Sequence, residues 1–183
     1  FDADPDEARR IQKSFFHEYG TTLNGLMTNH GVDPVSYLEY VHDIDVSPVP
    51  PNPELDAVLS QLPGRKLVYT NGSVPHAERV MDRLGITRHF DGVFDIVAAD
   101  YVPKPQPSAF DVFLAKYDVD PAGAVMVEDI ARNLEPAHVR GMTTVWIKSD
   151  HHWSGGDKDD PHIHHAIDDL VDWLNDVAGS IDW

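Results

Sequence analysis

The feature that most constrains the fold is an alternation of short apolar runs with amphipathic stretches through the second part of the chain. Most runs follow a turn that contains glycine, and the stretches between them carry apolar residues at helical spacing. Such alternation is typical of a parallel sheet covered on both faces. The runs are residues 66–70, 93–97, 124–128 and 143–147. The sequence therefore predicts an α/β fold with a doubly wound parallel sheet.

Helices are expected between these runs and at the end of the chain. The last of them has apolar residues on one stripe over residues 163–177, and we expect it to pack against the core. The others are residues 54–62, 75–84, 108–116 and 132–140.

The first third of the chain has helical spacing and no strand pattern. Its first helix is expected to begin at residues 4–7, with Asp4 as the N-cap and Pro5 at the first helical position. Residues 47–53 contain four prolines, which cannot donate backbone hydrogen bonds, so we interpret this stretch as a linker. The sequence thus divides into a small helical module, residues 1–47, and an α/β core, residues 48–183.

Composition narrows the possible partners. The chain has 183 residues and a formal net charge of -17, which argues against binding to nucleic acid or to an anionic membrane surface. No apolar run approaches the roughly 20 residues that cross a bilayer. Cysteine is absent, so disulfides and thiolate chemistry are excluded. We expect a cytoplasmic protein.

Polar residues follow the predicted strands at the edge where ligands bind in open parallel sheets. The first run ends at Thr70, and residues 70–73 offer a hydroxyl, an amide and a glycine turn that could cradle an anion. The alternative is an ordinary helix N-cap at Ser73. Lys104 stands between two prolines, which suits a cation aimed at a fixed anion, although a solvated loop lysine is equally compatible.

The third run ends at Glu128, Asp129 follows it as a second, adjacent carboxylate, and Asn133 comes four residues after Asp129. Neighbouring carboxylates repel each other unless a cation lies between them, and hard oxygen ligands suit Mg²⁺. The alternative is that one of them caps the following helix.

Taken in order, these residues resemble the motifs of the haloacid dehalogenase superfamily of phosphohydrolases. Thr70-Asn71 is similar to its second motif, Lys104 to its third, and Glu128-Asp129 with Asn133 to its fourth. The resemblance covers essentially the whole chain and implies a Rossmann-like core with a small helical cap, incomplete at its N-terminal side. Longer runs resemble the pyrimidine 5'-nucleotidase branch: residues 19–23, 25–27, 40–45, 70–73, 128–134 and 141–146.

The resemblance implies a Mg²⁺-dependent phosphomonoesterase that hydrolyses nucleoside 5'-monophosphates through an aspartyl-phosphate. Thr70 would bind a phosphoryl oxygen, and Asn71 would orient the phosphate or the nucleophile. Lys104 would offset negative charge, and Asp129 would hold Mg²⁺ with Glu128 beside it. Two cap segments, residues 19–27 and 42–45, would shape the nucleoside pocket.

The resemblance also implies a first motif, a hydrophobic strand that ends in Asp-x-Asp. Asp2 and Asp4 are one candidate pair, but the helix start at Asp4 is the stronger interpretation. In this family the first strand lies between the strands that end at Thr70 and Glu128. We therefore expect these residues to come from a longer protein, and we expect no phosphatase activity from a chain without that strand.

Two other functions stay open. One is a catalytically impaired or non-catalytic phosphate-binding relative that lacks the nucleophile. The other is a 2-haloacid dehalogenase, which Glu128 and Asp129 disfavour because that reaction needs no metal. Histidines between residues 151 and 165 could suggest a transition-metal site, but a polar loop is the favoured interpretation.

Overall fold

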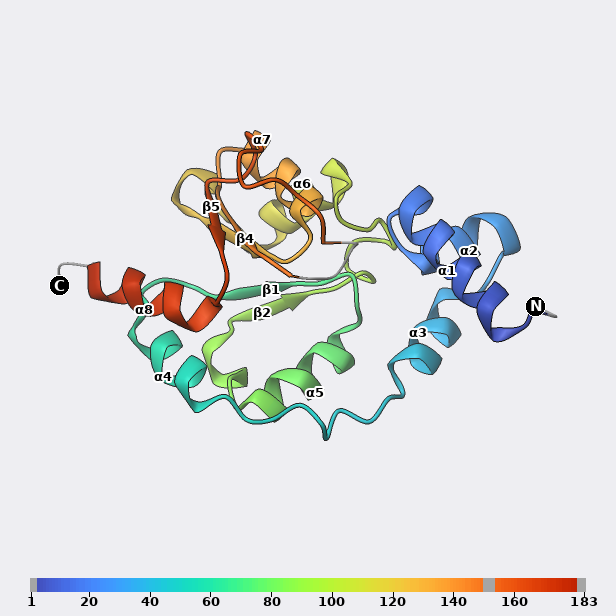
Figure 1. Ribbon diagram of the computed structural model, residues 1–183, viewed down its shortest axis with the longest axis horizontal. Helices are drawn as coiled ribbons and strands as arrows, with labels where there is room; N and C mark the ends of the chain where they lie inside the picture. Colours follow the sequence, from blue (N-terminus) through green and yellow to red (C-terminus); the bar gives the residue numbers. More distant parts are fainter. Residues whose placement is uncertain (1–2, 150–153, 181–183) are drawn as a thin grey trace.

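The computed structural model describes residues 3–149 and 154–180 (Figure 1). The helices are α1 Pro5–Tyr19, α2 Thr22–His30, α3 Pro34–His42, α4 Pro53–Gln61, α5 Val74–Leu84, α6 Pro107–Tyr117, α7 Glu135–Val139 and α8 Leu170–Ser180. The strands are β1 Leu67–Tyr69, β2 Gly92–Phe94, β3 Val125–Glu128, β4 Thr143–Ile147 and β5 His165–Ile167. Short 3-10 turns span Thr87–His89, Pro121–Gly123 and Ala131–Leu134.

The N-terminal helices α1, α2 and α3 lie in the segment that the sequence predicts as a helical cap, and they are called the cap below. Asp4 caps α1 as expected, because its carboxylate accepts hydrogen bonds from the amides of Asp6 and Glu7 at 3.0 and 2.9 Å. Helices α1 and α2 pack closely at Gly25, where an added Cβ would lie 2.4 Å from Cγ of Phe15. Only a residue without a side chain permits this approach.

The cap rests on the α/β part through a small apolar cluster. Leu23 of α2 and Leu38 of α3 are buried together with Ile96, which follows β2. The chain then runs from α3 to α4 without helix or strand, and Arg83 of α5 donates to the carbonyls of Ser47 and Val49 in this stretch. The division into residues 1–47 and 48–183 stays a prediction.

The strand pairs among residues 3–149 and 154–180 are all parallel, which confirms the predicted α/β class, but they form two sheets. β1 pairs with β2, and β3, β4 and β5 pair in that order. Within the described residues, β1 and β3 do not pair with each other. This separation is the arrangement expected if a strand between them is missing.

Helices cover both faces of the strands, as a doubly wound sheet requires (Figure 1). On one face, Val58 of α4, Met81 of α5 and Leu174 of α8 belong to one buried cluster. On the other face, α6 contributes Phe110 and Phe113 to two further clusters. The core thus lies on both sides of the strands whose ends carry the predicted site.

The predicted helix over residues 163–177 is wrong in its first part. Residues His165–Ile167 form β5 and pair with Val145–Ile147, and α8 begins only at Leu170. Without β5, this edge of β4 would have unpaired amides and carbonyls, and the strand pairing outweighs the local helical stripe.

The second predicted strand is also shorter than expected. β2 ends at Phe94, because the carboxylate of Asp95 accepts hydrogen bonds from the amides of Val74 and Ala98 at 3.0 and 2.8 Å. These contacts turn the chain away from the sheet.

Candidate active site

The loop after β1 carries the first predicted site residues. The amide of Thr70 still donates to Phe94 at 2.9 Å, so the residue continues the pairing with β2. The Thr70 hydroxyl accepts a hydrogen bond from the amide of Gly72 at 2.9 Å. Ser73 is at the N-cap position of α5, but its side chain makes no capping hydrogen bond. Ser73 therefore occupies the N-cap position that the alternative interpretation assigned to it, but its hydroxyl does not cap the helix.

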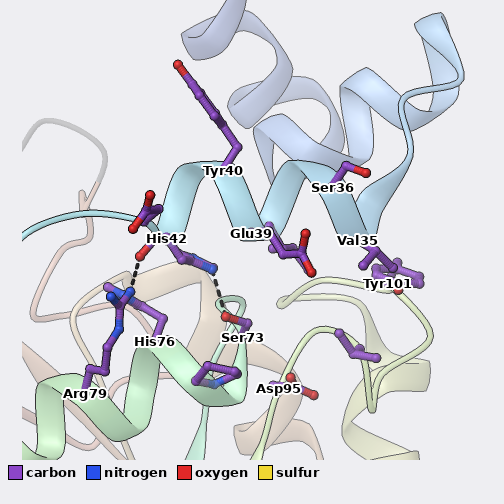
Figure 2. A pocket seen from close by; sticks show the side chains of 14 residues that line it. Val35, Ser36, Glu39, Tyr40, His42, Ser73, His76, Arg79, Asp95 and Tyr101 are labelled. Atoms are coloured by element: carbon purple, nitrogen blue, oxygen red, sulfur yellow. Dashed lines mark hydrogen bonds between the residues drawn. The ribbon is translucent and has the colours of Figure 1, made fainter.

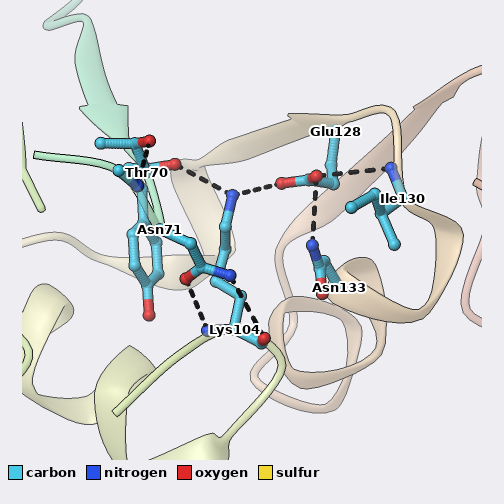
Figure 3. Close-up of polar contacts among 8 residues, drawn as sticks. Thr70, Asn71, Lys104, Glu128, Ile130 and Asn133 are labelled. Atoms are coloured by element: carbon cyan, nitrogen blue, oxygen red, sulfur yellow. Dashed lines mark hydrogen bonds and ion pairs between the residues drawn. The ribbon is translucent and has the colours of Figure 1, made fainter. Parts of the chain in front are cut away.

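Lys104 is buried, so the alternative of a solvated loop lysine is wrong. Its ammonium forms an ion pair with Glu128 and donates to the carbonyl of Tyr69 at 3.0 Å (Figure 3). Asn71 holds the backbone of Lys104, since its Oδ1 accepts from the Lys104 amide at 2.8 Å and its Nδ2 donates to the Lys104 carbonyl at 3.4 Å. The ends of β1 and β3 are thus linked through one cation.

Glu128 is buried at the end of β3 and faces Lys104. Its Oε1 also accepts hydrogen bonds from the side chain of Asn133 at 3.2 Å and from the amide of Ile130 at 3.3 Å. Burial raises the pKa of Glu128, but the Lys104 charge and the side-chain hydrogen bonds of Lys104, Asp129 and Asn133 outweigh it, so the net pKa is lowered. Glu128 is therefore an ionised partner of Lys104.

The pKa of Asp129, in contrast to that of Glu128, is raised. Burial raises its pKa, and the neighbouring Glu128 raises it further through a hydrogen bond and through its negative charge. A cation beside Asp129 would relieve this repulsion. Mg²⁺ keeps several water ligands and is often bound by one or two carboxylates together with substrate phosphates, so this chemistry fits Mg²⁺.

The described part of the chain does not form a complete metal cage by itself. Residues 3–149 and 154–180 contain no group of three or more His, Cys, Asp or Glu side chains that could hold a metal ion. The metal roles of Glu128 and Asp129 stay predictions. Of the histidine-rich stretch, residues 151–153 lie outside the described residues, and His164 binds Thr144 through its Nδ1 at 2.9 Å.

The structure brings together Thr70, Asn71, Lys104 and Glu128, with Asp129 next along the chain (Figure 3). It does not bring Asp4 to them. Asp4 caps α1, and Figure 1 shows the N-terminal end of the chain on the side of α1, α2 and α3 that is away from the strands. Asp2 lies outside the described residues.

A cavity of about 770 Å³ lies beside this site, and its lining includes His42 and Asp43 of the predicted pocket segment 42–45 but no residue of the segment 19–27 (Figure 2). It lies between α3 of the cap and α5 of the core, and its polar lining includes His42, Ser73, His76, Arg79 and Asp95. Asp95 could have been found as a polar residue that ends a strand. The contact of His42 with α5 has no local sequence signal.

Comparison with known proteins gives the family. The family model of haloacid dehalogenase-like hydrolases matches residues 7–139. Phosphate metabolism protein 8 of Saccharomyces cerevisiae is 31% identical over 157 residues, which cover 76% of this chain and 48% of that protein. Fructose-1-phosphate phosphatase YqaB of Escherichia coli is 32% identical over 113 residues, covering 60% of this chain and 58% of that protein. The chain thus spans about half the length of these curated relatives.

Solved structures share the fold. L-2-haloacid dehalogenase of Xanthobacter autotrophicus has a TM-score of 0.61 at 15% identity, over 95% of this chain and 83% of that one. The HAD phosphatase of Thermococcus onnurineus has a TM-score of 0.60 at 22% identity, over 95% and 80%. Among the described residues no helix has the length and apolar character needed to cross a membrane. On the match of the family model and the curated relatives, the chain belongs to the haloacid dehalogenase-like hydrolases.

Proposed function

We propose that the protein is a Mg²⁺-dependent phosphomonoesterase acting on nucleoside 5'-monophosphates, those of pyrimidines first. The observation that carries the proposal is Lys104, a buried ammonium held beside the Thr70–Asn71 loop at the ends of β1 and β3. A phosphatase among the relatives supports the reaction class. The sequence runs similar to the pyrimidine 5'-nucleotidase branch support the substrate class.

In this proposal the residues of the chain bind and orient the phosphoryl group. The Thr70 hydroxyl donates to a phosphoryl oxygen while it accepts from the Gly72 amide. Asn71 fixes the backbone of Lys104, and the ammonium of Lys104 opposes the negative charge that develops in the transition state. Asp129 would hold Mg²⁺, which when bound neutralises charge on the phosphoryl oxygens.

The nucleophile comes from the first motif in this proposal. A carboxylate oxygen of an Asp forms a bond to phosphorus as the bond from phosphorus to the ester oxygen breaks. A second Asp protonates the leaving oxygen and then activates the water that hydrolyses the aspartyl-phosphate. Among the described residues β1 and β3 do not pair with each other, and in this proposal the strand that carries the nucleophile lies between them, next to Lys104.

The test is release of inorganic phosphate from a panel of pyrimidine and purine nucleoside 5'-monophosphates with Mg²⁺. The protein is used as its gene encodes it, so that any residues before Phe1 are included. We expect Lys104→Met and Asp129→Asn each to lower kcat by about 10²–10³-fold. Lys158→Met, which removes an exposed lysine, is the matched control and should leave kcat unchanged.

A lack of phosphate release from every monophosphate would favour a non-catalytic phosphate-binding relative. That alternative rests on the ion pair in which Glu128 already neutralises Lys104. It would be supported if no monophosphate released phosphate and if aluminium fluoride with Mg²⁺ were not captured, because that mimic needs an intact Asp nucleophile. Release of halide from a 2-haloacid without metal would instead support a dehalogenase.

A further inference from the structure

The last residue of the cap helix α3 is held by the first turns of α5. His42 Nδ1 lies 2.8 Å from the hydroxyl of Ser73, and its ring stacks on that of His76 with centroids 4.5 Å apart and planes 9° from parallel (Figure 2). Arg79 donates to the carbonyl of His42. These contacts join cap and core through one residue.

The same imidazole lies against the loop that follows β1. A Cβ placed on Gly72 would be 3.5 Å from Nε2 of His42 and 3.3 Å from the hydroxyl oxygen of Thr70. His42 therefore lies within van der Waals reach of Gly72, beside the backbone that presents Thr70 and Asn71. A movement of α3 would therefore shift His42 relative to this loop and change its contacts with Gly72 and Ser73.

Charged groups of both signs surround His42. Glu39 and Asp43 come from α3 and the residue after it, Asp95 follows β2, and His76 and Arg79 come from α5. Burial lowers the pKa of His42, and the charges of His76 and Arg79 lower it further. Burial and Arg79 also lower the pKa of His76. Both rings are thus neutral at neutral pH.

We propose that His42 is a positioning residue whose neutral imidazole locks the cap helix α3 onto the loop of residues 70–73, and that protonation releases the lock. The proposal rests on the proposed function only in taking that loop as the phosphate-binding one. An opened cap would expose His42 to solvent and return its pKa toward the ordinary value of 6.5. The docked state therefore binds fewer protons, so the lock is strongest above this value and weakens as the pH falls below it.

Amide hydrogen exchange of the wild-type chain, followed by mass spectrometry and corrected for the intrinsic pH dependence of exchange, tests the lock without any substrate. We expect α3 and residues 70–76 to exchange about fivefold faster at about pH 5.5 than at about pH 7.5. His42→Ala should show the fast exchange at both pH values. His42→Asn, whose amide can replace Nδ1 in the bond to Ser73 but does not titrate, should show slow exchange at both.

The matched control is His17→Asn, which changes an exposed histidine of α1 in the same cap and should behave as the wild type. Exchange in β3 and β4 reports whether a variant is folded. The proposal is overturned if His42→Asn keeps the pH dependence of the wild type, or if folded His42→Ala exchanges as slowly as the wild type. Because no turnover is measured, either result is independent of whether the protein is a phosphatase.

Discussion

Replacing Lys104 by methionine should destabilise the protein strongly, because it leaves the Glu128 carboxylate buried without its cation. The two side chains retain only 8% and 7% of their exposure. Removing one partner of a buried pair costs about 3–5 kcal/mol. Glu128 would keep its hydrogen bonds from Asn133 and Ile130, so we expect the lower end, about 3 kcal/mol.

The pH dependence gives this prediction a second signature. In the wild type the pKa of Glu128 is lowered, so its stabilising contribution is present above its unfolded value of 4.5 and is lost as the pH falls through the folded value. In Lys104→Met the ammonium is gone, and burial, which raises the pKa, becomes the main influence. The difference in stability between variant and wild type should therefore shrink as the pH falls toward about 4.5.

Urea unfolding followed by circular dichroism measures these free energies, with Lys158→Met as an exposed control expected within about 0.5 kcal/mol of the wild type. The double variant Lys104→Met with Glu128→Gln removes both charges and should recover most of the loss, because no buried charge is left unpaired. A loss below about 1 kcal/mol for Lys104→Met, or strict additivity in the double variant, would refute the argument that the two groups depend on each other.

Two further predictions concern packing and turn formation. Gly25→Ala should lower the free energy of unfolding by about 1–3 kcal/mol, because its Cβ would clash with Phe15. The control Gly179→Ala, whose Cβ would have nothing within 4 Å, should be neutral or stabilising. Equal effects of the two changes in thermal unfolding would contradict this prediction. Asp95→Ala should destabilise by about 1–2 kcal/mol through loss of the bonds to the amides of Val74 and Ala98. Asp95→Asn, which keeps one acceptor oxygen, should lose less, and an equal loss for both variants in urea unfolding would argue against these bonds.

Local patterns in the sequence were sufficient for much of the fold. Helix starts depend on contacts within about four residues, and the Asp4 N-cap is found where the sequence predicts it. The apolar runs predicted parallel strands correctly, and the polar residues after them, Thr70, Lys104 and Glu128, do lie together because parallel strands end at a common edge.

The points that local patterns got wrong or left open have the same physical origin, since each depends on a partner far away in the sequence. Residues 163–169 carry a helical stripe, but the unpaired edge of β4 turns His165–Ile167 into a strand. For Lys104 the sequence left a site cation and a solvated loop lysine equally open, and only the fold, which buries it against a carboxylate 24 positions later, decides between them.

By itself, the sequence determined the class of the fold, the helix boundaries that depend on local caps, and the set of side chains gathered at the strand ends. The tertiary structure alone decided which of these side chains pair. In the structure Glu128 forms an ion pair with Lys104, and the negative charge of Glu128 raises the pKa of the neighbouring Asp129. The tertiary structure also joins His42 of the cap to Ser73 of the core. Pairing of this kind depends on the direction of side chains and on burial, which residue order does not encode locally.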